Sequence, residues 1–313
     1  MCCLFGILNY QQSLNNKQLN KMVYTLSKAC EARGTDATGI AYNHNGNLCI
    51  YKRPLPAHKI LYRIPDDVHY VMGHTRMTTQ GDEKFNYNNH PFLGRAKNTD
   101  FALAHNGVLY NDEILKIREH LPETKIETDS YVAVQLIEKK KTLCTDSLRY
   151  MAESIEGSFT ITVMDKENNL HFVKGDNPMC IYHFKDKGVY IYASTEEILL
   201  KALGKMQVKL GRYEKIDITC GDILTIDKFG ILTKTTFKTD SLDGFSFASY
   251  YWRSSIPSCE TKSTLPSSYQ EDYLKHLKTE AEYCGYSSSL IDTLLADGFT
   301  TDDIEEMIYC GTY

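Results

Sequence analysis

Hydrophobic and polar positions along the first 237 residues divide the chain into short strands and amphipathic helices. Strand-like alternation recurs between turn residues, over 48–52, 101–109, 158–164, 170–174, 180–184, 188–193 and 222–226. Apolar residues at helical spacing mark five further segments, 17–32, 111–120, 130–140, 146–154 and 195–203. Many strands combined with two groups of helices are typical of a layered domain. The pattern therefore predicts an α+β fold class.

The character of the chain changes after residue 237. Residues 239–266 contain Ser, Thr, Gly and Pro among a few aromatic residues, which is typical of a linker that wraps along a surface. Three helical segments with apolar faces follow, over 267–283, 287–296 and 302–309. We expect two parts, a main domain over residues 2–237 and a linker with a short helical C-terminal extension over 238–313.

Composition indicates a globular chain that crosses no membrane. Charged residues are 24% and hydrophobic residues 42% of the 313, which is close to globular averages and sufficient for a sizeable core. No apolar run approaches the roughly 18 residues of a membrane helix, and the N-terminus has no basic region that would begin a signal peptide. The net charge is −5 with dispersed basic residues, so neither nucleic acid nor a membrane is expected as a partner.

Ten cysteines are spread along the chain without a C-x-x-C pair or a close His/Cys cluster. Zinc sites need such spacing, so we expect no metal. The chain also lacks a phosphate-binding P-loop and a dinucleotide-binding G-x-G-x-x-G string, and we expect no cofactor. The unpaired cysteines fit a reducing compartment, which predicts a cytoplasmic protein.

Cys2 has the position of an N-terminal nucleophile. Removal of Met1, which is usual before a small residue, would leave Cys2 with both a thiol and a free α-amine. The pKa of an α-amine is roughly 7.7 to 8.0, so near neutral pH the amine can accept the thiol proton. Most cysteines are simply small buried side chains, so position alone does not decide between the two interpretations.

Three later segments carry polar residues suited to bind an amino acid. Arg76 follows an apolar run at the end of an expected strand, Asn106 and Gly107 interrupt another strand, and Asp129 precedes a helical stretch. Taken singly they are more simply a surface ion pair, a hairpin turn and a helix N-cap. Taken together they supply a guanidinium for a carboxylate, a carboxylate for an ammonium and donors for a developing oxyanion.

These segments resemble the class II glutamine amidotransferases, the members of the Ntn-hydrolase superfamily that use an N-terminal cysteine. The resemblance covers roughly residues 2 to 235 and rests on short strings that occur in the family's order. The strings are Cys2-Cys3-Leu4-Phe5-Gly6, Arg33-Gly34-Thr35-Asp36-Ala37-Thr38-Gly39-Ile40, Gly73 to Thr79, His105-Asn106-Gly107, Glu127-Thr128-Asp129, Glu156 to Phe159, 174–178, 192–196 and 220–223. Cys3, Met77 and Gln80 depart from residues that are usual in the family.

The resemblance implies a four-layer αββα sandwich with Cys2 at the start of a central strand. It also implies roles for six residues: Cys2 as nucleophile with its own amine as base, Asn106 and Gly107 as oxyanion hole, Arg76 and Asp129 as the residues that hold glutamine, and Thr79 as an auxiliary contact. The implied reaction is hydrolysis of the glutamine side-chain amide to glutamate and ammonia through a thioester.

The destination of the ammonia and the role of the tail stay open at this level. Family members that build larger products carry an acceptor domain of hundreds of residues, and a tail of about 75 residues cannot hold one. The chain is therefore expected to release ammonia or to deliver it to a separate synthase subunit. The tail either docks a partner through Leu290, Leu294 and Ile304 or packs on the enzyme core. Two other functions remain, an Ntn amidohydrolase that acts on another amide and a catalytically silent regulatory or binding homologue.

Overall fold

The structure, a computed structural model, describes residues 2–239, Leu242, residues 286–296 and the single positions Leu274, Lys278, Ala281 and Ile304. The chain forms two compact units, Met1–Ser249 and Tyr250–Tyr313. Most of the predicted linker and of the predicted helices 267–283 and 302–309 lies outside the described residues. The predicted domain boundary after residue 237 stays a prediction.

Strands of the described part of the first unit form two antiparallel sheets of seven and six strands. The first sheet has the order β11 (Glu214–Ile216), β9 (Cys180–Phe184), β10 (Val189–Ala193), β1 (Cys3–Asn9), β4 (Tyr70–Arg76), β2 (Ala37–His44) and β3 (Asn47–Arg53). The second has the order β13 (Leu232–Thr236), β12 (Asp222–Ile226), β8 (Leu170–Lys174), β7 (Gly157–Asp165), β6 (Asp100–Leu109) and β5 (Phe92–Arg95). Strand β1 is central in the first sheet, between β10 and β4.

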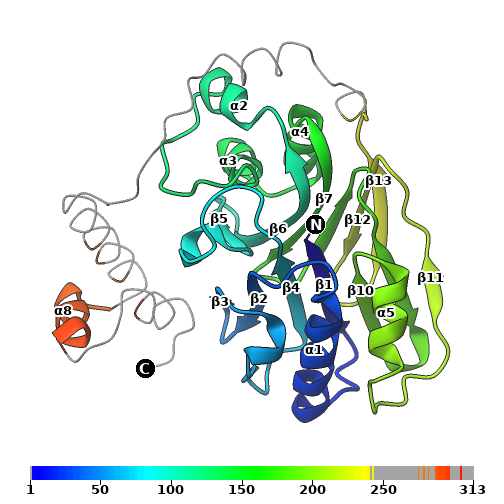
Figure 1. Ribbon diagram of the computed structural model, residues 1–313. Coiled ribbons are helices and arrows are strands. Elements are labelled where there is room, and N and C mark those ends of the chain that lie inside the picture. The colour runs from blue at the N-terminus through cyan, green and yellow to red at the C-terminus, as the bar shows by residue number, and fades with distance from the viewer. Residues whose placement is uncertain are drawn as a thin grey trace. The chain divides into compact units, whose positions relative to one another are not determined.

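Two groups of helices cover the outer faces of the sheets (Figure 1). Helices α1 (Asn16–Cys30) and α5 (Glu196–Leu203) pack on each other and on the first sheet. The helices of the other group are α2 (Asp112–Arg118), α3 (Tyr131–Lys139) and α4 (Thr145–Ser154). Their apolar side chains pack with residues of β5, β6 and β7 in one core. The molecule thus has the four-layer αββα sandwich that the resemblance implied.

Side-chain alternation along β6 builds a separate core on each face of the second sheet. Ala102 and Ala104 pack with Leu4 of β1 in the core between the two sheets. Phe101 and Leu103 point the other way, into the core beneath α2, α3 and α4. Since successive side chains of a strand point to opposite faces, one strand serves both cores. The strands are thereby fixed firmly enough to position polar residues at one edge of the sandwich.

The seven predicted strands and five predicted helices are confirmed with small shifts at their ends. Strands β1 and β4 were expected at Cys2 and before Arg76, whereas β2, β5, β11 and β13 carried no recognisable alternation. Strand β2 is buried along nearly its whole length and contains small residues, so its sequence does not alternate. Strands β5 and β11 are only four and three residues long.

The C-terminal unit contains the described helix α8 (Ser288–Ala296), which the sequence predicted. Its apolar residues form a small cluster of Ala281, Ile291, Leu294 and Ile304, with Leu290 packed against it. Leu294 and Ile304 are 4% and 0% exposed and fill a core of the unit itself, so they are not available for the docking alternative. None of the helices in the described part of the chain has the length and apolarity needed to span a bilayer.

Candidate functional site

A cavity lies where β1 begins and β4 ends, beside β6. It is partly open to solvent, and its wall consists of Cys2, Arg76, Met77, Thr79, Gln80, His90, His105, Gly107, Thr128, Asp129 and Ser130. Five of the six predicted site residues are therefore in the wall of one cavity. The sixth, Asn106, is buried directly beside Gly107.

Strand pairing places Cys2 at the mouth of the sandwich. Cys3 pairs with Thr75 in the antiparallel register of β1 and β4, so Cys2 lies next to the end of β4. The Met77 N–H donates to the Cys2 sulfur at 3.5 Å, and the Arg33 Nε donates to the Cys2 carbonyl at 2.8 Å. Both contacts come from residues outside β1 and hold Cys2 in place.

The neighbouring cysteines differ in access to the cavity. Cys2 is 9% exposed and lies in its wall, whereas Cys3 is fully buried and its thiol contacts the Leu4 carbonyl at 3.5 Å. Burial raises the pKa of the Cys2 thiol, and the Met77 backbone contact and the Arg76 charge offset only part of this effect. The Cys2 thiol is therefore mainly protonated at neutral pH, and attack on a substrate requires a base.

Asn106 and Gly107 lie inside strand β6 and do not form the hairpin turn that their sequence also allowed. Gly107 has a φ of 151°, and a Cβ at this position would lie 1.7 Å from the Ser158 carbonyl oxygen. Only glycine fits there. The Asn177 side chain donates to the Asn106 carbonyl at 3.0 Å, and the Asn106 Nδ2 lies 3.5 Å from the Ser194 Oγ.

Ser194 joins strand β1, which follows Cys2, to the strand of Asn106. Its hydroxyl oxygen accepts the Leu4 N–H at 2.8 Å, and its own N–H donates to the Leu4 carbonyl at 2.9 Å. The same hydroxyl faces the Asn106 amide. Ser194 thus links β1 to β6 next to the cavity.

Arg76 is a buried residue and not a surface ion-pair partner. It is 3% exposed, and its guanidinium donates to the Asn89 side chain at 2.7 Å and to the carbonyls of Gln80 and Gly81 at 2.6 and 2.9 Å. Arginine carries five N–H groups in a planar fork and keeps its charge in proteins. These contacts therefore orient a permanent positive charge in the cavity wall.

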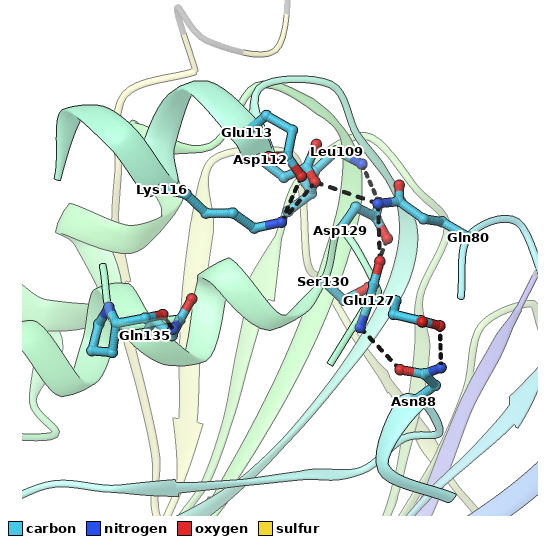
Figure 2. A network of polar contacts seen from close by, with 11 residues as sticks. Gln80, Asn88, Leu109, Asp112, Glu113, Lys116, Glu127, Asp129, Ser130 and Gln135 are labelled. Atoms are coloured by element: carbon cyan, nitrogen blue, oxygen red, sulfur yellow. Dashed lines mark hydrogen bonds and ion pairs between the residues drawn. The ribbon is translucent and has the colours of Figure 1, made fainter. Parts of the chain in front are cut away.

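Asp129 does not cap helix α3. The helix begins at Tyr131 after Ser130, and Asp129 turns its carboxylate toward β6. Its Oδ2 accepts the Leu109 N–H at 2.6 Å and its Oδ1 accepts the Ser130 hydroxyl at 3.3 Å. Figure 2 shows Asp129 between these partners, and the residue is 3% exposed. It places a negative charge in the wall that also contains Arg76.

A hydrogen-bond network connects the segment that bears Arg76 to the segment that bears Asp129 (Figure 2). The Gln80 Nε2 donates to the Glu127 carbonyl at 3.0 Å. Asn88 exchanges two bonds with Glu127: its Nδ2 donates to the carboxylate at 2.8 Å, and its Oδ1 accepts the Glu127 N–H at 3.0 Å. One hydrogen-bond network therefore holds together the segments that carry Arg76 and Asp129.

Three buried histidines lie at the cavity, two of them, His90 and His105, in its wall. The rings of His74 and His90 are 4.3 Å apart, and the His74 Nε2 donates to the His105 carbonyl at 3.0 Å. Burial lowers the pKa of all three, that of His74 to about 3, so their rings are neutral. In the described part of the chain, no group of three or more His, Cys, Asp or Glu residues is placed to hold a metal ion.

Several residues that support the site belong to the strings that carry the family resemblance, although the sequence indicated no role for them. Arg33 holds the Cys2 carbonyl, Asp36 accepts the Thr78 N–H at 2.7 Å, and Ser194 and Asn177 hold β1 and β6. Their membership in the ordered strings was the only signal in the sequence. Their contacts join segments far apart along the chain, which spacing does not reveal.

The fold and the cavity together define a class: an N-terminal-nucleophile hydrolase sandwich with a cysteine at the start of its central strand. Residues 74–201 match a family described as glutamine amidotransferase domain. A glutamine–fructose-6-phosphate aminotransferase (isomerizing) from Bacillus cereus is 27% identical over 243 residues, which are 75% of this chain and 37% of the relative.

Two solved structures share the fold. One is the glutamine phosphoribosylpyrophosphate amidotransferase from B. subtilis, with a TM-score of 0.59, 19% identity, and coverage of 77% of this chain and 50% of that chain. The other, described as the allosteric regulatory enzyme of purine biosynthesis, has a TM-score of 0.61, 19% identity, and coverage of 76% and 50%.

The chain therefore carries a glutamine amidotransferase domain of the class II type, which is an enzyme domain. It spans only 37% of the length of the Bacillus cereus relative.

Proposed function

We propose that this chain hydrolyses the side-chain amide of glutamine to glutamate and ammonia. The observation that carries the proposal is the shared cavity of Cys2, Gly107, Arg76 and Asp129. Glutamine offers an amide carbon to the thiol, a carboxylate to the guanidinium and an ammonium to the carboxylate. The match to the glutamine amidotransferase domain family supports the choice of glutamine.

In the first half of the reaction, the Cys2 α-amine, freed by removal of Met1, takes the thiol proton. The sulfur attacks the amide carbon, and the amide oxygen becomes an oxyanion that the Gly107 N–H and the Asn106 Nδ2 stabilise. The protonated amine then gives its proton to the departing nitrogen. Ammonia leaves, and a γ-glutamyl thioester on Cys2 remains.

In the second half, water attacks the carbonyl carbon of the thioester. The α-amine takes a proton from the water, the same donors hold the second oxyanion, and the carbon–sulfur bond breaks. The proton held by the amine returns to the sulfur, and glutamate dissociates. Thr79, in the cavity wall, is an auxiliary contact for the bound amino acid.

An ammonia-release assay with glutamine, asparagine and γ-glutamyl substrates tests the proposed function. Preferential turnover of glutamine is the expected result. Turnover of a different amide would instead indicate an amidohydrolase with another substrate, and ammonia from none of them would indicate a silent homologue. Mass spectrometry of the intact protein is expected to show a chain that starts at Cys2, because a retained Met1 would block the amine.

We predict that Asp129→Ala and Arg76→Ala each raise the KM for glutamine roughly 10- to 100-fold, because a charge-assisted hydrogen bond contributes about 1.5 to 3 kcal/mol. Steady-state kinetics of ammonia release measures the effect. Asp146→Ala is a matched control, since Asp146 is an exposed aspartate in the first turn of α4. An unchanged KM in Asp129→Ala would show that the ammonium binds elsewhere.

In this proposal the ammonia passes to a separate acceptor synthase in the cytoplasm. The Bacillus cereus relative is described as an aminotransferase for fructose 6-phosphate, and it is much longer than the region shared with this chain. Isotope transfer from side-chain-labelled glutamine tests the step. With the partner present, the label is expected in the acceptor product at external ammonium concentrations that do not support its synthesis.

We predict that a chain ending at residue 266 retains the wild-type kcat and KM for glutamine. Among the residues that the structure describes, none in the cavity wall lies beyond Ser130, and the described apolar residues of the tail form their own cluster. Ammonia release by the truncated protein, with its melting temperature as a control for folding, measures the outcome. A folded truncated protein without activity would place part of the site in residues 267–313.

A further inference from the structure

The Asp129 end of the cavity is tied to strand β6 by two hydrogen bonds. The Leu109 N–H donates to the Asp129 Oδ2 at 2.6 Å, and the His105 Nδ1 lies 2.8 Å from the Ser130 Oγ. The Ser130 hydroxyl also reaches the Asp129 Oδ1, at 3.3 Å. All of these side chains are nearly inaccessible, with His105 1%, Asp129 3% and Ser130 4% exposed.

The hydrogen bonds that join His105, Ser130 and Asp129 form a relay. Its donors and acceptors follow from the chemistry of these three side chains. A carboxylate oxygen only accepts, so the Ser130 O–H donates to Asp129. While the Ser130 O–H donates to Asp129, the Ser130 oxygen can accept from the His105 Nδ1 at 2.8 Å. The Ser130 side chain makes no capping hydrogen bond to α3.

The relay reaches β6 on both sides of the proposed oxyanion donors. His105 precedes Asn106 and Gly107, and Leu109 follows them, all within one strand. Each bond leads to residues 129–130, so the strand that holds the oxyanion donors also fixes the carboxylate. The distance between the two parts of the site is therefore set by the strand and by the relay.

We propose that Ser130, held by His105, is a positioning residue that sets Asp129 at a fixed distance from Asn106 and Gly107 and thereby selects an amide of the chain length of glutamine. The inference rests on the proposed function. Asparagine is one methylene shorter, so its ammonium does not reach Asp129 while its amide lies against the oxyanion donors. Without the Ser130 hydroxyl, the Asp129 carboxylate keeps only its bond to Leu109 and can turn.

The experiment compares the full-length wild type with Ser130→Ala, Ser130→Thr and Ser147→Ala. Ser147 is a matched control, a buried serine of α4 whose hydroxyl, among the described residues, bonds only Cys144. Ammonia release is measured with glutamine, asparagine and 4-carbamoylbutanoate, which is glutamine without its α-ammonium.

We expect Ser130→Ala to lower kcat/KM for glutamine roughly 10-fold, mainly through KM, because the charged contact is weakened and not deleted. Asparagine and 4-carbamoylbutanoate, which do not use the Asp129 contact, are expected to keep their wild-type kcat/KM. Ser130→Thr restores the hydroxyl and the preference for glutamine, and Ser147→Ala leaves the preference unchanged.

Two results would overturn the inference: an equal loss of kcat/KM for all three substrates, which indicates a general structural role, or an unchanged KM for glutamine in Ser130→Ala. Failure of the proposed function is a different result, since the wild type itself would then release no ammonia from glutamine. The wild-type assay therefore separates the two cases.

Discussion

Cys2→Ala is expected to reduce ammonia release from glutamine to background, since loss of a covalent nucleophile costs on the order of 10⁶-fold in kcat. The thioester cannot form without the sulfur, and alanine offers no other nucleophile. Because the charges of Arg76 and Asp129 are untouched, binding of glutamine is expected to persist. Single-turnover ammonia release and calorimetric titration with glutamine measure the two effects separately.

Cys3→Ala is the matched control for this prediction. The Cys3 side chain is fully buried, contacts the Leu4 carbonyl and does not reach the cavity, so the variant should stay substantially active. Its stability is expected to fall slightly, because a small buried side chain is shortened. An inactive Cys3→Ala beside an active Cys2→Ala would move the nucleophile by one residue. Peptide mapping after reaction with an electrophilic glutamine analogue should place the adduct on Cys2.

Much of the fold could be predicted from the sequence because its strands and helices carry clear periodicity. Strand β7 alternates over its predicted range, and the apolar spacing of 17–32 gave helix α1. Helix α1 also begins with a reciprocal cap, in which the Asn15 side chain accepts the Gln18 N–H at 2.9 Å. Strand β2 escaped detection because both of its faces are buried, which removes the alternation.

The charged and catalytic candidates were accessible to sequence reasoning, whereas the residues that orient them were not. In the sequence, Asp129 is indistinguishable from a helix N-cap. Only the folded structure shows that its carboxylate points toward Leu109. The pairing of His105 with Ser130 depends on the approach of β6 to the start of α3, which no local pattern encodes. The sequence showed that Leu294 lies on an apolar helix face. It did not show that this face packs within its own unit.

The oxyanion site gives the second large effect. Asn106→Ala is expected to lower kcat on the order of 100- to 1000-fold with little change in KM, because the negative charge on the amide oxygen exists only in the transition state and the tetrahedral intermediate. Gly107 is a poor position for the same test, since any side chain there collides with the Ser158 carbonyl and disturbs β7. Asn106→Ala removes the donor and leaves the backbone intact.

The controls for Asn106→Ala exploit how the residue is held. Asn98→Ala removes a side chain that bonds only Leu143 in the described structure, away from the cavity, and should leave kcat unchanged. Asn177→Ala removes the bond to the Asn106 carbonyl and should lower kcat by less than Asn106→Ala does, because the donor is displaced but present.

A normal kcat in Asn106→Ala would leave Gly107 as the sole predicted donor. A raised KM with normal kcat would instead assign Asn106 to ground-state binding of glutamine, since only interactions made in the transition state lower kcat when they are lost.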